Sequence, residues 1–119
     1  MRLNTYFFIS LLVILSSCRT EIKFDKVKWA EKADLMTFSN RKSMINDLIK
    51  NYHLRGQSYK QIIELLGEPQ SDLDSNFKIF YDVDIDYGSD IDPVYSKTLS
   101  FQFSIDSIVQ KYDVIEWKK

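Results

Sequence analysis

Residues 54–69 read LRGQSYKQIIELLGEP, and this stretch decides the fold. Ser58 with Gln61 three positions later forms the pattern of a capping box, in which two side chains bond the free backbone groups of a helix's first turn. At the other end, Gly67 suits a left-handed C-cap and Pro69 cannot continue a helix. Between these ends, the apolar side chains recur at helical spacing on one face: Tyr59, Ile62, Ile63, Leu65 and Leu66. The stretch therefore predicts one short amphipathic helix that buries this face.

A second helix is expected just before this one, over residues 40–52. Its apolar residues also form a single stripe: Met44, Ile45, Leu48, Ile49 and Tyr52. Ser39 or Asn40 can cap its start, and Gly56 can adopt the left-handed conformation that ends a helix. The sequence therefore predicts two consecutive helices with a short turn between them.

Beyond Pro69 the spacing of apolar residues changes from helical to alternating. One alternating run contains Phe77, Ile79, Tyr81, Val83 and Ile85, and the next contains Leu99, Phe101, Phe103 and Ile105. A last strand is expected over residues 108–117, where blurred alternation indicates a β-bulge. Hairpin connections imply an antiparallel sheet, and its apolar face needs the helices as a cover. We therefore predict an α+β fold, a two-layer sandwich of two N-terminal helices packed on a three-stranded antiparallel sheet.

The N-terminus has the features of an export signal. Arg2 supplies a positive charge, and residues 6–15 form an apolar run that is too short to span a bilayer. The order Leu15, Ser16, Ser17, Cys18 follows and resembles the bacterial lipobox. The resemblance implies that Cys18 receives a diacylglycerol and becomes the first residue of the mature protein. The alternative is an ordinary signal peptide that ends near a cysteine.

We expect three regions: a lipoprotein signal peptide over residues 1–17, the lipidated Cys18 with a tether over residues 18–38, and one domain over residues 39–119. The tether region contains Phe24 and Trp29, and large aromatic side chains in a soluble segment usually find a surface to pack on. We therefore expect both to lie against the domain.

Composition narrows the possible functions. Cys18 is the only cysteine among 119 residues, so neither an internal disulfide nor a thiolate metal site is expected. Acidic and basic residues nearly balance, with 17 Asp and Glu against 16 Lys and Arg. This balance gives no reason to expect a nucleic-acid partner.

An acidic run in the first strand is the best candidate for ion binding. Asp82, Asp84 and Asp86 alternate like the first ligands of a calcium loop, which also needs Gly at its sixth position and Glu at its twelfth. Tyr87 and Pro93 occupy those positions, so the motif fails. We expect the three aspartates to form the solvent face of the strand. A weak cation site, or a patch for a basic partner, is the alternative.

The sequence contains no pattern that indicates catalysis. His53 is the only histidine, so a His pair for zinc cannot form. Glu64 and Glu68 flank the end of the second helix, where helix solubility explains them. The motifs of phosphate-binding loops, nucleophile elbows and dinucleotide sites are missing. We therefore expect a protein that is not an enzyme and holds neither metal nor cofactor.

The helix boundaries and the strands together resemble the SmpA/OmlA (BamE-like) family of small bacterial lipoproteins. The helical part of the resemblance rests on residues 54–58 and 62–69. The downstream part matches the family's strands at Tyr81, Tyr87, Leu99, Phe101, Phe103, Asp106 and Val109. The resemblance implies the same two-layer fold and, because a lipobox is common in the family, a lipid anchor. It explains the fold and identifies no active residue.

These features favour a non-enzymatic protein-interaction or scaffold module, anchored by lipid and serving in envelope assembly or maintenance. Arg19 follows the cysteine in place of the aspartate that retains lipoproteins in the inner membrane of enteric bacteria, which favours the outer membrane. The alternative is a lipoprotein that binds a small ligand or a lipid in an apolar pocket between helices and sheet.

The best candidate for a protein contact is the loop over residues 86–97, the longest irregular connection expected, together with the neighbouring sheet edge. It holds Tyr87 and Tyr95, which can anchor a contact, and aspartates that can steer a basic surface toward them. The alternative is that Tyr87 ends a strand, Pro93 stiffens a turn and the aspartates prevent association of sheet edges.

Replacing Cys18 with Ser or Ala should leave an uncleaved precursor without lipid, because the lipoprotein signal peptidase acts on the diacylglyceryl form. The measurement is incorporation of radiolabelled fatty acid in growing cells, with the unchanged chain as control. Label that persists in the variant would exclude Cys18 as the acceptor.

Overall fold

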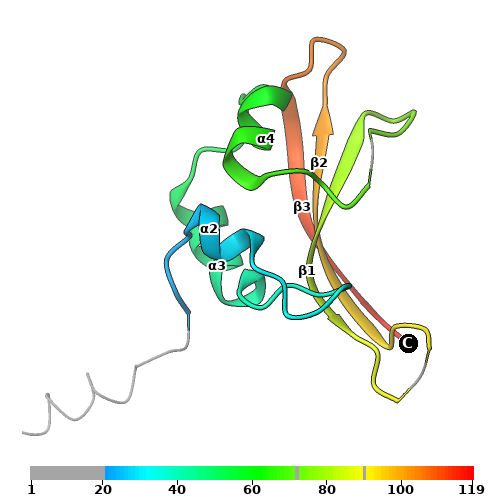
Figure 1. Ribbon diagram of the computed structural model, residues 1–119. Coiled ribbons are helices and arrows are strands. Elements are labelled where there is room, and N and C mark those ends of the chain that lie inside the picture. The colour runs from blue at the N-terminus through cyan, green and yellow to red at the C-terminus, as the bar shows by residue number, and fades with distance from the viewer. Residues whose placement is uncertain (1–20, 72, 90) are drawn as a thin grey trace, which may run out of the picture.

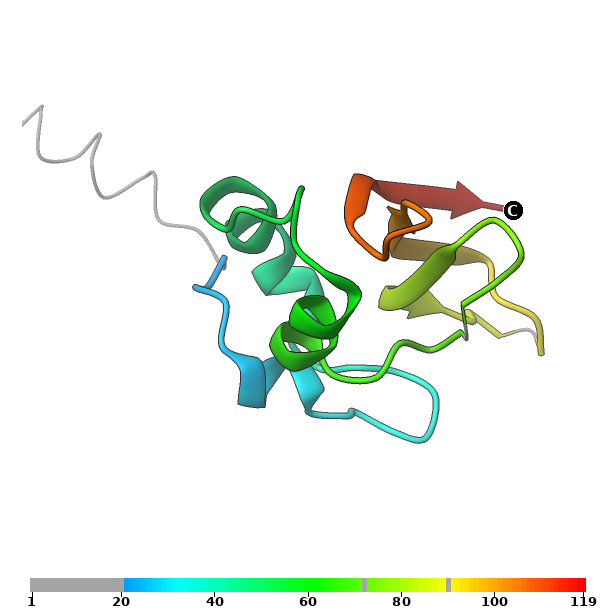
Figure 2. The same cartoon turned by 90° about the horizontal axis from the view of Figure 1, so that it is seen from above.

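The computed structural model describes residues 21–71, 73–89 and 91–119, so the predicted signal peptide and Cys18 lie outside the described residues. The elements run in the order α2 (Lys26–Ala30), α3 (Arg41–Asn51), α4 (Tyr59–Leu66), β1 (Lys78–Asp86), β2 (Tyr95–Phe103) and β3 (Val109–Lys118). The strands form one antiparallel sheet in the order β1-β2-β3, and the helices lie together on one side of it (Figure 1 and Figure 2). The predicted α+β arrangement is confirmed, and α2 is an additional short helix.

Helix α4 begins and ends where the sequence predicts. The Ser58 hydroxyl accepts a bond from Gln61 N at 3.1 Å, and Ser58 N donates to Gln61 Oε1 at 2.8 Å, which completes the capping box. Gly67 follows with a φ of +82°, and its N–H donates to Ile63 O at 2.8 Å. Local sequence signals therefore define this helix.

The buried face of α4 is narrower than predicted. Ile62 and Leu66 are buried, and since they stand four residues apart they project into the core together. Leu65 lies about 100° around the helix from Leu66 and is half-buried. Leu65 therefore packs at the rim of the core, whereas Leu66 lies inside it.

Helix α3 buries the predicted stripe through Met44, Ile45 and Leu48. It ends at Asn51, and Gly56 lies beyond it, where a φ of +88° shapes the following turn instead of closing the helix. Gly56 N donates to Val109 O at 3.0 Å, and Val109 N donates to Gln57 O at 2.8 Å. The turn between the helices therefore holds the start of β3.

A β-bulge in β1 rearranges the acidic run. Asp82 pairs with Thr98 of β2, but Asp84 pairs with the neighbouring Lys97, so one residue of β1 is extra. Because neighbouring residues of β2 point to opposite faces, Asp82 and Asp84 lie on opposite faces of the sheet. The expectation that Asp82, Asp84 and Asp86 share one solvent face is wrong, since the two-residue period is interrupted at a bulge.

The other differences from the sequence pattern occur at the turns. β2 begins at Tyr95, so the connection between β1 and β2 covers residues 87–94 and is shorter than the expected 86–97. Ile105, expected on the buried face, is 85% exposed in the turn after β2. Phe77 precedes β1 with a φ of +59° and is also exposed. The bulge expected in β3 is confirmed opposite the end of β2.

The segment before α3 packs against the helices. The Asp25 side chain caps α2, and Trp29 of α2 is completely buried. Phe24 packs on Trp29 with ring centroids 5.7 Å apart, so both aromatic residues lie against the domain as expected. The folded unit therefore starts earlier than residue 39, where the sequence places the boundary.

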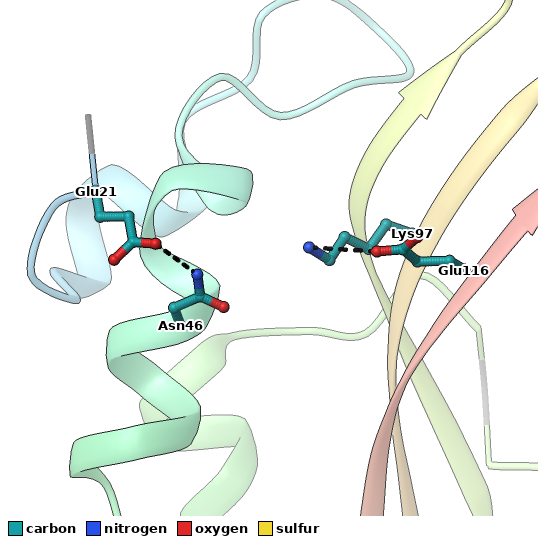
Figure 3. Close-up of polar contacts among 4 residues, drawn as sticks. All are labelled: Glu21, Asn46, Lys97 and Glu116. Atoms are coloured by element: carbon teal, nitrogen blue, oxygen red, sulfur yellow. Dashed lines mark hydrogen bonds and ion pairs between the residues drawn. The ribbon is translucent and has the colours of Figure 1, made fainter. Parts of the chain in front are cut away.

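The first described residues are bonded to α3. Asn46 Nδ2 donates to Glu21 Oε1 at 2.8 Å (Figure 3), and Phe24 N donates to Asp47 Oδ2 at 2.7 Å. The bond from Phe24 N also holds the pKa of the Asp47 carboxyl below its usual value. The domain therefore includes the chain from Glu21 onward.

The core fills the space between the helices and the inner face of the sheet. Tyr81 of β1 and Phe101 of β2 are completely buried there and meet edge to face, with ring centroids 6.0 Å apart. The Tyr81 hydroxyl donates to Gly67 O at 2.8 Å, which joins the end of α4 to β1. Burial raises the pKa of this phenol well above its usual value, so it is neutral and able to donate.

Leu66→Ala should lower the free energy of unfolding by about 2–5 kcal/mol, because it removes buried surface and leaves a cavity. Leu65→Ala should cost less, since part of that side chain already lies in solvent. Urea unfolding of the chain without residues 1–20 measures both changes. A loss below about 0.5 kcal/mol for Leu66→Ala would show that this face of α4 is not in the core.

Candidate functional site

Arg41, the first residue of α3, is the most completely buried charged side chain of the described residues, with 2% of its surface exposed. Its Nε donates to Trp29 O at 2.9 Å. Its Nη1 donates to Gln70 Oε1 at 2.7 Å and to Asp82 O at 2.8 Å. The guanidinium also lies over the Phe38 ring, 3.3 Å from the centroid. Arg41 therefore joins α2, α3, the segment after α4 and the edge of β1.

Among the described residues, no carboxylate lies at ion-pair distance from Arg41. In the described part of the chain, the one ion pair joins Lys97 Nζ and Glu116 Oε1 at 3.8 Å (Figure 3). Burial lowers the pKa of Arg41 to about 10, which leaves it positively charged at neutral pH. Burial also raises the pKa of the Asp82 carboxyl, an effect that the charge of Arg41 opposes. The charge of Asp82 opposes the lowering of the Arg41 pKa, and the carbonyl oxygens and aromatic rings around the guanidinium add to the compensation for its buried charge.

A cavity of about 520 Å³ opens beside Arg41. It is bounded by residues 30–41, by residues 66–70 at the end of α4, and by the last part of β1. Its lining is mixed, with Phe38, Leu66, Ile85, Lys32, Glu68 and Asp82 among its residues. The cavity has the size of a small-ligand site, and residues from the ends of α2, α3 and α4 and from β1 contribute to its lining.

Two loop tips next to the cavity expose aliphatic side chains. Leu35 is 94% exposed and Ile91 is 95% exposed. The Asp34 carboxylate holds the first loop in its turn by accepting two backbone N–H bonds, which also lower the pKa of that carboxyl. The Tyr87 hydroxyl, from the second loop, lies 3.7 Å from Met36 Sδ. The loop patch, as we call it, consists of Leu35, Met36, Tyr87 and Ile91, which line one shallow depression.

The structure separates the two tyrosines predicted to contact a partner. Tyr87 belongs to the loop patch, whereas Tyr95 begins β2 and is not among the lining residues. Burial raises the pKa of Tyr95, and the charges of Glu116 and Asp84 add to that effect. The two tyrosines therefore belong to different elements, a loop and a strand, and a partner contact at Tyr87 and Tyr95 stays a prediction.

Three residues of this region were not singled out by sequence reasoning: Leu35, Ile91 and Arg41. Leu35 follows an aspartate that can form a turn, and Ile91 stands between two aspartates. An aliphatic residue in such a turn-forming segment is the sequence signal that could have indicated these two exposed side chains. Arg41 gave no signal, because its burial depends on Trp29 and Asp82, which lie 12 and 41 residues away in the chain.

The described residues give little basis for metal or acid-base chemistry. Within residues 21–71, 73–89 and 91–119, no group of three or more His, Cys, Asp or Glu side chains is placed to hold a metal ion. His53, Glu64 and Glu68 are all exposed. No helix in this part of the chain has the length and apolar character needed to cross a membrane.

No protein-family model, curated protein or solved structure matches the chain. By its fold and its site, the protein is a small α+β domain in which the exposed loop patch lies next to the cavity beside Arg41. Membership of the SmpA/OmlA family stays a prediction from the sequence.

Arg41→Met should lower the free energy of unfolding by about 2–5 kcal/mol. Methionine keeps the apolar contact with Phe38 but leaves Trp29 O and Asp82 O without their donor. Lys42→Met is the matched control, since Lys42 is the exposed neighbour and should change stability by less than about 0.5 kcal/mol. Urea unfolding that gives equal stabilities for the two variants would contradict the role of Arg41.

Proposed function

We propose that this chain is an outer-membrane lipoprotein whose domain is a non-enzymatic protein-interaction module. The lipobox-like order before Cys18, with Arg19 after it, supports the anchor and its membrane. The loop patch carries the interaction role, because it gathers exposed apolar side chains from two separate loops at one place. The resemblance to the SmpA/OmlA family adds support to both parts of the proposal.

The distance from Cys18 to the folded domain determines how the anchor holds it. Glu21 is bonded to Asn46 of α3, and it follows Cys18 by three residues. An extended chain spans at most about 3.5 Å per residue, so Cys18 lies within about 11 Å of Glu21. A lipid on Cys18 would therefore hold the domain against the membrane surface, in contrast to the long tether that the sequence suggests.

This attachment also gives the domain an orientation. Figure 1 and Figure 2 show the described chain starting beside the helices, on the side away from the sheet. The helix layer then faces the membrane, where Ile22 and Val27, 37% and 72% exposed, are available for apolar contact. The sheet and the loop at residues 87–94 face away from the membrane. A partner in the aqueous space can reach the loop patch in this orientation.

The chemistry of the loop patch indicates what kind of partner it fits. Burial of an aliphatic side chain such as Leu35 or Ile91 contributes about 1.5–3 kcal/mol. Exposed carboxylates surround the patch at Asp34, Asp86 and Asp92. The partner should therefore present an apolar surface with basic residues at its margin.

A lipoprotein that binds a small ligand is the second candidate, and the cavity beside Arg41 favours it. Lys32, Glu68 and Asp82 contribute charged groups to the lining, so the cavity suits a polar ligand better than an acyl chain.

The double change Leu35→Ser with Ile91→Ser should abolish capture of the partner by chemical crosslinking in native membranes. The melting temperature should change little, since both side chains lie in solvent. Ile105→Ser is the matched control, because Ile105 is 85% exposed in the turn after β2 and should keep its captured partners. Equal capture by the double variant and the control would contradict the loop patch as the contact surface.

A pair of single changes tests the two predicted tyrosines. Tyr87→Ser should reduce capture, since Tyr87 is part of the loop patch, and Tyr95→Ser should leave capture unchanged. The measurement is the same crosslinking, accompanied by thermal unfolding of each variant. Reduced capture by Tyr95→Ser at unchanged stability would move the contact surface onto the sheet.

A further inference from the structure

The outer edge of β1 is covered by other parts of the chain. Gln70 N donates to Phe80 O at 2.9 Å, and Asp82 N donates to Gln70 Oε1 at 2.8 Å. Asp82 O accepts from Arg41, and Lys78 exchanges bonds with Asp74. Most of this edge is therefore closed to another strand.

Within the described residues, the outer edge of β3 is covered only where the strand begins. Val109 is bonded to the turn at Gly56 and Gln57, and Arg55 Nε donates to Gln110 O at 3.0 Å. Over residues 111–117, β2 is the only part of the described chain that bonds to the backbone of β3. This edge is seven residues long and exposes apolar side chains, since Val114, Ile115 and Trp117 are 38%, 47% and 49% exposed. A long edge with exposed apolar residues is a surface for strand pairing.

The hydrogen bonds along the outer edge of β1 show which backbone groups of β3 point outward from the sheet. The backbone of Lys78, Phe80 and Asp82 points outward from β1. Bonding pairs alternate along an antiparallel sheet, so the register of the three strands carries this alternation across to β3. The backbone groups of Tyr112, Val114 and Glu116 therefore point outward from β3. The side chains of Tyr112 and Val114 share the face of their partners Phe101 and Leu99, which is the core face.

We propose that this edge pairs antiparallel with the same edge of a second copy of the chain, about a two-fold axis at Val114. Val114 then faces its counterpart, and Tyr112 faces Glu116 in both directions. Each of these facing pairs exchanges two backbone hydrogen bonds. On the outer face, Lys111 lies opposite Trp117, a pairing that places the ammonium group near an indole ring.

Charge excludes several alternative axes, and because Val109 and Gln110 are already bonded, Val114 is the middle of the open edge over residues 111–117. If the core faces of the two sheets are continuous, each residue must lie opposite a residue of the same face in the other copy. The two-fold axis then passes through a residue and not between two residues. An axis at Asp113 or Glu116 would place a carboxylate opposite its own copy, and an axis at Ile115 would place Lys111 opposite Lys119. Like charges directly opposite each other are destabilising. The axis at Val114 avoids all such pairs along residues 111–117.

The same axis suits two copies in one membrane, an argument that rests on the proposed lipid anchor. With continuous core faces, both helix layers lie on one side of the joined sheet. Each described chain starts on its own helix side, so both starts face the same way (Figure 2). The lipids of two copies can then enter one bilayer. The repulsion between like charges at the other axes is the same with or without a lipid anchor.

Disulfide trapping of the full-length chain in cell membranes tests the pairing. Val114→Cys should give a covalent dimer on oxidation with copper phenanthroline, since facing residues of antiparallel strands have Cα atoms about 5.5 Å apart. Ile105→Cys, in the exposed turn after β2, is the control for random collision. The parent chain is the control for Cys18.

The register is tested separately. Lys111→Cys and Trp117→Cys should trap a dimer when expressed together, and neither should do so alone. The reason is that the two copies of residue 111 would lie about 20 Å apart, six residues along the facing strand.

A Val114→Cys chain that melts like the parent but traps no more dimer than Ile105→Cys would overturn the pairing. If Ile115→Cys traps more dimer than Val114→Cys, the proposed axis is wrong. Trapping should be unchanged in a chain that also carries Leu35→Ser and Ile91→Ser, because the loop patch is not part of this contact. Failure of trapping and failure of partner capture are thus distinguishable.

Discussion

The contact on which the rest of this fold depends is the buried guanidinium of Arg41. One side chain satisfies carbonyl groups from α2 and β1 and an amide oxygen from the segment after α4, while it stacks on the Phe38 ring. Burying a positive charge without a paired carboxylate is costly, and several directed hydrogen bonds together with aromatic faces offset that cost in this position. Because the donors of a guanidinium are fixed in one plane, they also set the relative positions of the segments they bind. The cavity and the first loop of the loop patch both lie beside this contact.

The helices cover one face of the sheet, and this arrangement separates the surfaces of the molecule (Figure 1). The chain enters on the helix side, fixed to α3 from Glu21 onward. The loops that carry Leu35 and Ile91 extend from the other end of the same arrangement and meet beside Tyr87. The proposed anchor on one side and the apolar loop patch on another are compatible with a module that works at a membrane while it binds a partner in water. Close attachment to the membrane would limit the orientations in which that partner can approach.

The two edges of the sheet differ for a physical reason. On β1, Gln70, Asp74 and Arg41 supply the hydrogen bonds that a neighbouring strand would otherwise make. On β3, the turn after α3 supplies such bonds only at the first residues. A bulge divides the aspartates of β1 between the two faces of the sheet. Bonds across the fold cover the edge of β1, and the remaining edge of β3 keeps its pairing capacity.

The sequence by itself determined the features that depend on local interactions. The capping box at Ser58 and Gln61, the stop at Gly67, the stripe on α3 and the two alternating runs each follow from neighbours a few residues apart, and they were sufficient to predict the fold class. The packing of Phe24 and Trp29 was also predictable, because such side chains bury large apolar areas.

The tertiary structure decided which residues became the site. The hydrogen-bond acceptors of Arg41 lie 12 to 41 residues away in the chain, and Leu35 meets Tyr87 and Ile91 only because two loops converge. The bulge in β1 belongs with these features, since the register between strands is set by the pairing of whole segments and cannot be read from one strand alone.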